Sequence, residues 1–202
     1  MYRTSNRVLI LMIFVTLMMS MGFWFCEHRI EQPMQAPTPG KIVINEVLYN
    51  PVGSNAGNQL VELKNIGSEP VELNCWWFCA RQDYAQIPNV SIGSGEFLIA
   101  HIRTNGTNTS TDVFLPSMLI LQSVSDLNLY RNANFTNPAS IVHFVQWGGV
   151  PPFNRESEAV SARLWTVGDF IPGVADGHSI EYDGSGFSST DWFDQLNPTI
   201  GF

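Results

Sequence analysis

Short runs of apolar and β-branched residues, separated by turn-forming residues, recur along the chain from residue 41 onward. Glycine, asparagine or proline follows closely after each of the four clearest runs, which are 41–50 (KIVINEVLYN), 59–66 (QLVELKNI), 96–102 (EFLIAHI) and 141–147 (IVHFVQW). Further short strands are expected at 71–73, 76–80, 117–125, 127–131 and 179–182, and a short helix at 155–164. Strands separated by turns at roughly 8–12-residue spacing are typical of an all-β sandwich or barrel.

Alternation within the runs predicts which side chains face the core. Successive residues of a strand point to opposite faces of the sheet. Both faces of 41–50 are largely apolar, so this strand is expected to be covered on both sides. In 59–66, Val61 and Leu63 are expected to point inward, whereas Glu62 and Lys64 are expected to face solvent.

The first 25 residues have a different pattern. Arg3 and Arg7 precede an apolar run at 8–25, which is the layout of a secretory signal peptide. The run is also close to the roughly 18 apolar residues at which a helix begins to span a bilayer. We therefore predict a signal peptide or a retained N-terminal anchor at 1–25, a proline-containing linker at 26–40 and a folded domain at 41–202. Membrane contact is expected only through the N-terminal segment, if it is not cleaved.

Composition narrows the class of protein. The 202 residues include 45% hydrophobic and only 14% charged residues, which excludes a long disordered polyampholyte. The net charge of -8 and the pI near 4.8 argue against binding to a phosphate backbone, so nucleic acid is not an expected partner.

Several short motifs resemble the lamin tail domain. In chain order they are 42–47 (IVINEV), 60–65 (LVELKN), 70–76 (PVELNCW), the step from Ile87-Pro88 to 95–98 (GEFL), and Trp192 with 197–201 (NPTIG). The corresponding family patterns are I-x-I-x-E-V, V-E-L-x-N, V-x-L-x-G-W, P…G-x-x-L and W…P-T-P-G. The resemblance spans roughly residues 41–201, and its specificity comes from the order of the motifs.

This resemblance implies an immunoglobulin-like antiparallel β-sandwich used as a binding or tethering module, in a family whose bacterial members are often exported. We therefore expect an exported, non-enzymatic module at the cell envelope or outside the cell that contacts a protein partner. Two residues depart from the pattern. Cys75 stands where the family often has glycine, and Ile200 replaces the second proline. Glu46 and Asn65 are expected to satisfy backbone groups inside or at the edge of the sheet.

The sequence contains no recognisable catalytic motif. It has no His-Glu-x-x-His, no Gly-x-Ser-x-Gly and no phosphate-binding loop. His143 is expected to be a hydrogen-bonded core residue. His178, Asp176 and Ser179 are neighbours in the sequence, but catalytic triads assemble from distant segments. No catalytic residue is assigned, and a hydrolase built around the 148–177 segment remains a rival interpretation.

Two binding interpretations also remain. Late aspartates offer the oxygen ligands that calcium prefers, although their spacing matches no known calcium loop, and a solvated acidic edge is the simpler reading. Tryptophans are expected to fill the core, with a carbohydrate-stacking platform as the alternative. The aspartates are Asp169, Asp176, Asp183, Asp191 and Asp194, and the tryptophans are Trp76, Trp77, Trp147, Trp165 and Trp192. No metal or cofactor residue is assigned, and a carbohydrate- or calcium-binding adhesion module is the alternative function.

Two of the three cysteines, Cys75 and Cys79, are close in the sequence. In a straight strand their Cα atoms are roughly 13 Å apart, which is too far for a disulfide. Two buried free thiols are the main expectation, and a disulfide across a bulge is the alternative.

Overall fold

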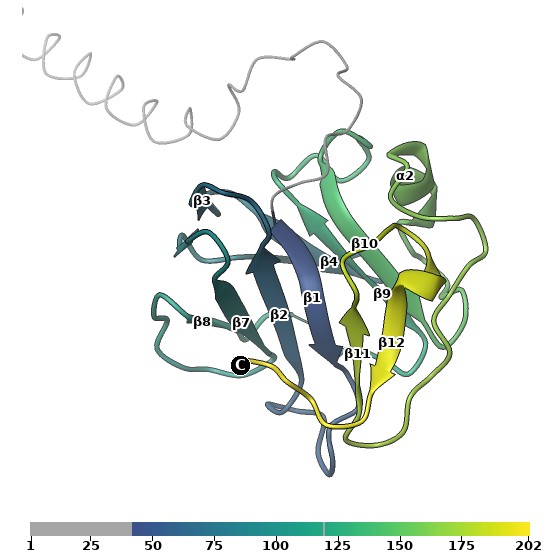
Figure 1. Ribbon diagram of the computed structural model, residues 1–202, viewed down its shortest axis with the longest axis horizontal. Coiled ribbons are helices and arrows are strands. Elements are labelled where there is room, and N and C mark those ends of the chain that lie inside the picture. The colour runs from purple at the N-terminus through teal and green to yellow at the C-terminus, as the bar shows by residue number, and fades with distance from the viewer. Residues whose placement is uncertain (1–41, 119) are drawn as a thin grey trace, which may run out of the picture. The chain divides into compact units, whose positions relative to one another are not determined.

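Strands dominate the computed structural model, which describes residues 42–118 and 120–202 (Figure 1). The predicted leader at 1–25, the linker at 26–40 and Lys41 lie outside the described residues. The helices among the described residues are α2 (Glu156–Ser161), where a short helix was predicted, and the 3-10 turn η1 (Ser189–Asp191). The prediction of an all-β fold is therefore confirmed.

The larger of two main sheets joins the beginning of the domain to its end. Its strands are β1 (Ile42–Leu48), β2 (Leu60–Asn65), β7 (Phe97–Ile102), β8 (Asp112–Leu115), β11 (Ser179–Tyr182) and β12 (Trp192–Gln195). They are arranged in the order β12-β11-β1-β2-β7-β8, and only β7 and β8 pair in parallel. The C-terminal strands thus lie beside the first strand (Figure 1).

The second sheet packs across the first. Its strands are β4 (Trp77–Ala80), β5 (Asp83–Gln86), β9 (Ser125–Tyr130) and β10 (Ile141–Trp147), arranged β10-β9-β4-β5. β1 contacts β10, and α2 packs against β10 as well. A separate two-stranded ribbon pairs β3 (Val71–Glu72) with β6 (Ser91–Ile92).

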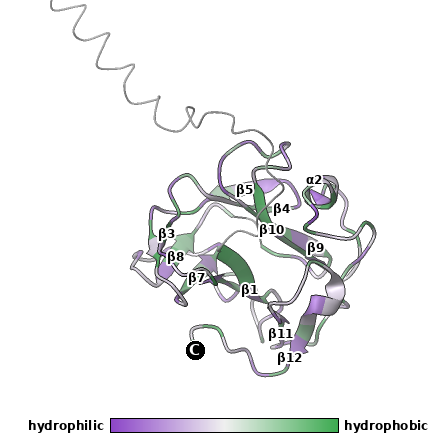
Figure 2. Ribbon diagram, turned by 45° about the horizontal axis from the view of Figure 1, so that its top comes forward, coloured by the Kyte–Doolittle hydropathy of each residue, from purple (hydrophilic) through white to green (hydrophobic). Residues whose placement is uncertain are grey.

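The core lies between the two main sheets because apolar side chains of both point there. Figure 2 shows the hydrophobic colour concentrated on interior strands, β1 among them. Ile44, Phe78, Phe144 and Trp147 are almost entirely buried. Tyr49 stacks on Trp147 with ring centroids 4.9 Å apart, so an aromatic pair links the end of β1 to the end of β10.

One predicted strand is wrong, and a side chain explains why. The described residues 117, 118 and 120–124 are not in a strand, and β9 begins only at Ser125. The buried amide of Gln59 donates to the Leu121 carbonyl at 2.7 Å and accepts from the Leu121 N–H at 2.8 Å. Because a side chain satisfies both backbone groups, this segment stays at the sheet edge without entering a ladder. The short strands β5, β6 and β8 were not predicted.

The cysteines differ from the main expectation. Cys75 is disulfide-bonded, whereas Cys79 is a buried free thiol. The prediction of two free thiols is therefore wrong for Cys75, and the alternative bridge between Cys75 and Cys79 is also wrong. The remaining cysteine, Cys26, lies outside the described residues. Burial raises the pKa of the Cys79 thiol to about 12, which makes this thiol unreactive in the folded protein.

Among residues 42–118 and 120–202, no helix combines the length and the apolar character needed to cross a bilayer.

We predict that iodoacetamide, added in denaturant without reductant, labels Cys79 and leaves Cys75 unlabelled. In the native protein Cys79 is also expected to resist labelling, because it is buried and its thiolate is disfavoured. Peptide mass spectrometry reads out both conditions. Labelling of Cys75 in denaturant without reductant would contradict the disulfide.

Candidate functional site

Three glutamates lie side by side on the larger sheet. Glu46 of β1 is the cross-strand partner of Glu181 on β11 and of Glu62 on β2. Glu46 and Glu62 are buried, and Glu181 is half-buried. Like charges directly opposite each other destabilise a sheet, so this row needs compensating donors.

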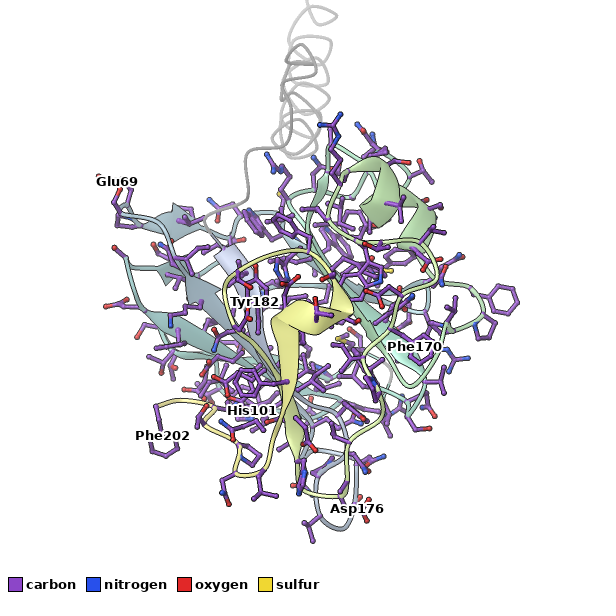
Figure 3. All side chains as sticks on the ribbon, turned by 45° about the vertical axis from the view of Figure 1, so that its right-hand side comes forward. Glu69, His101, Phe170, Asp176, Tyr182 and Phe202 are labelled. Carbon is purple, nitrogen blue, oxygen red and sulfur yellow. The ribbon has the colours of Figure 1, made fainter. Side chains whose placement is uncertain are left out.

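The C-terminal segment supplies most of those donors. Glu46 accepts hydrogen bonds from the Thr199 N–H at 3.0 Å and the Thr199 hydroxyl at 2.9 Å, and from the Ser179 hydroxyl. Glu62 accepts from the Gly201 N–H at 2.7 Å and from the Asn45 amide at 2.7 Å. The chain beyond β12 is therefore bound across the glutamate row, and Figure 3 shows Phe202 at its tip, with the ring outside the fold.

This arrangement corrects one prediction and confirms another. Glu62 was expected to face solvent, but it is buried because the C-terminal segment covers this face of the sheet. Burial raises its pKa. Glu46 and Asn65 satisfy backbone groups as predicted, and the Asn65 amide donates to the carbonyls of Glu69 and Ile92 at 2.8 Å. The carboxylate oxygens of the glutamate row therefore accept hydrogen bonds from the same chain, and they attach the C-terminal segment to the larger sheet.

His143 is buried between the two sheets in an aromatic environment. Its ring centroid lies 4.9 Å from that of Tyr182, 6.0 Å from Trp192 and 6.3 Å from Phe187. The prediction that it is hydrogen-bonded is wrong, because neither ring nitrogen has a partner. Burial lowers its pKa to about 3, so the imidazole is neutral at ordinary pH.

His178, Asp176 and Ser179, which are neighbours in the sequence and were not assigned a catalytic role, each have a different hydrogen-bond partner. His178 Nδ1 is 2.8 Å from an Asp194 carboxylate oxygen, but Asp176 accepts instead from the Asn50 amide. The Ser179 hydroxyl donates to Glu46. His178, Asp176 and Ser179 therefore do not form a nucleophile–base–acid chain.

The late aspartates and the tryptophans have separate local roles. Asp169 accepts from Ser189, and Asp191 accepts from Ser188 in a capping box at η1. No three metal-ligating side chains converge within the described part of the chain. Trp147, Trp165 and Trp192 are buried, which confirms the core prediction for them, and Trp76 and Trp77 are partly buried.

A cavity of about 370 Å³ opens where the two main sheets meet at one end. It is lined by Ala80, Arg81, Arg103, Ile120, Gln122 and Ser125. Leu48 pairs with Leu60, and Leu60 with His101, so Arg103 lies at the end of the sheet opposite Ile42. In Figure 3 this end is marked by Asp176, which is bonded to Asn50 just after β1, and Glu69 marks the opposite end.

Both cavity arginines have backbone conformations that favour glycine. Arg81 and Gln82 form the two-residue turn between β4 and β5, with φ values of 50° and 62°. Arg103, directly after β7, has φ of 52°. A two-residue hairpin turn with both central φ values positive usually contains Asn-Gly, and each non-glycine residue held there costs about 1 kcal/mol or more. Such strain concentrates at functional positions.

A buried carboxylate fixes the turn that carries Arg81. Asp126 accepts from the Arg81 N–H at 2.7 Å and from the Arg155 N–H at 3.2 Å. Its side chain is fully buried, and burial raises its pKa. The Gln82 amide also donates to the Asn154 carbonyl at 3.3 Å. The segment around residue 154 is therefore held beside the β4–β5 turn.

We call this region the arginine end: the β4–β5 turn (80–83), Arg103, and the segments 120–125 and 148–155. Sequence reasoning missed it, because its parts come from four separate segments without a shared motif. The only local signal was a pair of arginines at turn positions in an acidic chain.

Comparison with known proteins found no family model that matches the sequence and no significantly similar curated protein.

We predict that Glu46→Ala lowers the free energy of unfolding by about 3 kcal/mol, because the Thr199 and Ser179 donors lose their buried acceptor. The matched control is Glu181→Ala, for which a loss below about 1 kcal/mol is expected because Glu181 is half-buried. Urea unfolding followed by tryptophan fluorescence measures both. Equal losses would contradict a special role for Glu46.

We also predict that His143 lowers the free energy of unfolding at acid pH. Below pH 6.5 the unfolded imidazole binds a proton, but His143 in the folded state does so only near pH 3. Stability from this group is therefore present above pH 6.5 and is lost as the pH falls toward 3. Unfolding free energies of wild type and His143→Leu, measured across this window, should show a steeper fall for wild type. Parallel pH profiles would contradict the prediction.

Proposed function

We propose that this chain is an exported, non-enzymatic binding module with an immunoglobulin-like sandwich of the lamin-tail type. It acts through protein–protein contacts at the cell envelope or outside the cell. The observation that carries the proposal is the arginine end, where cationic and apolar side chains are exposed together on an acidic domain.

Hydrogen bonds between the sequence motifs support the lamin-tail assignment. Glu46 belongs to the first motif, Glu62 to the second, and Thr199 and Gly201 to the closing one. Residues that define the resemblance therefore contact one another across more than 130 positions of sequence. Cys75, which stands where the family often has glycine, also supports the assignment. Its φ of 62° is the left-handed conformation that glycine adopts easily.

The disulfide at Cys75 supports export. Disulfides persist in oxidising compartments and are rare where thiols are kept reduced. This agrees with the basic and apolar pattern of residues 1–25, which the sequence itself suggests is an export signal or an anchor.

Exposed apolar side chains at the arginine end support a protein partner. Phe153 is 74% exposed, Val150 46% and Val124 37%. Val124 lies next to Gly148 and Gly149, so these residues belong to adjoining segments. Clustered apolar exposure beside polar residues is typical of protein interaction sites.

The rival interpretations gain no comparable support. The hydrolase interpretation needs His143 or His178 beside a carboxylate and a nucleophile, and the described residues place neither in such a set. The carbohydrate interpretation needs an exposed tryptophan row, but Trp147, Trp165 and Trp192 are buried.

We predict that a photoreactive phenylalanine analogue at Phe153 crosslinks the full chain to a discrete partner in its own host. The same analogue at Glu69, exposed at the opposite end (Figure 3), should give little or none of that product. Immunoblots of irradiated cells provide the measurement. A product of the same size and yield from both positions would contradict binding through the arginine end.

A further inference from the structure

The arginine cavity is lined by two cationic residues that form no ion pair with the described part of the chain. Among the described residues, neither Arg81 nor Arg103 forms an ion pair, and both side chains are exposed. The other described arginine near this end, Arg155, is bonded to Glu158 and Tyr84. Both arginines line one cavity, in a chain with 10 basic and 18 acidic residues.

Guanidinium chemistry indicates the type of group that the cavity accepts. Arginine presents planar, forked donors that match the two oxygens of a carboxylate. Gln122 and Ser125 add polar side chains to the lining, while Ala80 and Ile120 add apolar surface. A volume of about 370 Å³ lies within the usual range for small-ligand pockets.

The surroundings favour a carboxylate with an apolar neighbour over a polyanion. The net charge of -8 repels an extended anion such as a nucleic acid. Val124 directly precedes Ser125 of the lining, and Phe153 directly precedes Asn154, whose carbonyl accepts from Gln82. An exposed apolar surface therefore adjoins the cationic cavity.

Hydrogen bonds of the backbone hold both cavity arginines in place. Asp126 fixes the Arg81 N–H, and the Arg103 N–H donates to the Leu115 carbonyl at 2.9 Å. Both arginines stand in the left-handed conformation, with φ of 50° and 52°. The fixed backbone therefore holds both arginines at the cavity, although glycine or asparagine at these positions relieves strain.

We propose that the arginine cavity binds a carboxylate of a partner peptide, with an apolar residue of that peptide against Val124 and Phe153. The proposal rests on the proposed function, because it names the ligand chemistry of the same binding end. It adds a specificity that the sandwich fold alone does not supply.

The test uses the full chain in detergent, labelled with ¹⁵N, and the probe N-acetyl-phenylalanine. Its neutral amide and inorganic phosphate are the comparison probes. We expect millimolar binding of the acid, with shifts at the amides of residues 80–82, 103 and 120–125, at least tenfold weaker binding of the amide, and weaker binding at higher salt. Phosphate binding as tightly as the acid would overturn the carboxylate assignment, and so would equal binding of acid and amide.

Substitutions of arginine test whether the acid binds at the cavity. Arg81→Gln and Arg103→Gln should each weaken acid binding about tenfold or more, whereas Arg163→Gln should leave it unchanged. Arg163 is a matched control, because it is exposed, has φ of 61° and does not line the cavity. Equal weakening by all three variants would overturn the proposal.

A second variant separates binding from folding. Replacing Arg81-Gln82 by Asn-Gly should raise the urea midpoint, because Asn-Gly suits this turn, and should abolish acid binding. Retained binding in this variant would overturn the proposal.

If Phe153 crosslinks a partner but the acid does not bind, the carboxylate proposal fails and the proposed function stands. If the acid binds but Phe153 crosslinks no partner, the proposed function fails and the assignment of a carboxylate to the cavity stands.

Discussion

The carboxylate of Glu46 is a charge placed inside a sheet, and a buried charge is tolerated only where hydrogen-bond donors replace water. Those donors come from Ser179 on a neighbouring strand and from Thr199 beyond the last strand. One side chain of β1 therefore adds to the ladder that joins β1 to β11, and it attaches the segment beyond β12, which no ladder holds. Adjacent Glu62 repeats the arrangement with Gly201.

Asp126 has the corresponding role in the second sheet. Its buried carboxylate accepts backbone N–H groups from the β4–β5 turn and from the segment that leads into α2. Asn128, two residues further along β9, donates to the same carboxylate at 2.7 Å and to the Cys79 carbonyl at 2.9 Å. Each main sheet thus uses a buried acid to hold loops that no ladder holds, and the loops held by Asp126 form the arginine end.

The strands with regular apolar patterns were predictable, because alternation and turn residues agreed locally. Five strands were found where they were expected, at 42–48, 60–65, 97–102, 141–147 and 179–182. Errors arose where a distant partner decided the outcome. Gln59 diverts the segment around Leu121, and Gly201 covers Glu62, neither of which is visible in local sequence. The arginine cavity was unpredictable for the same reason, since Arg81 and Arg103 come to line one cavity only when the two sheets pack.

The link between Glu46 and Thr199 spans 153 positions, so it joins the first described strand to the segment that follows β12. Until the C-terminal residues have been synthesised, the central strand of the larger sheet contains a carboxylate without its donors. Completion of the fold therefore depends on contacts between residues far apart in the sequence, and such contacts slow folding. Closure of the larger sheet is therefore a late step of folding, because a donor that β1 needs follows it by 153 positions.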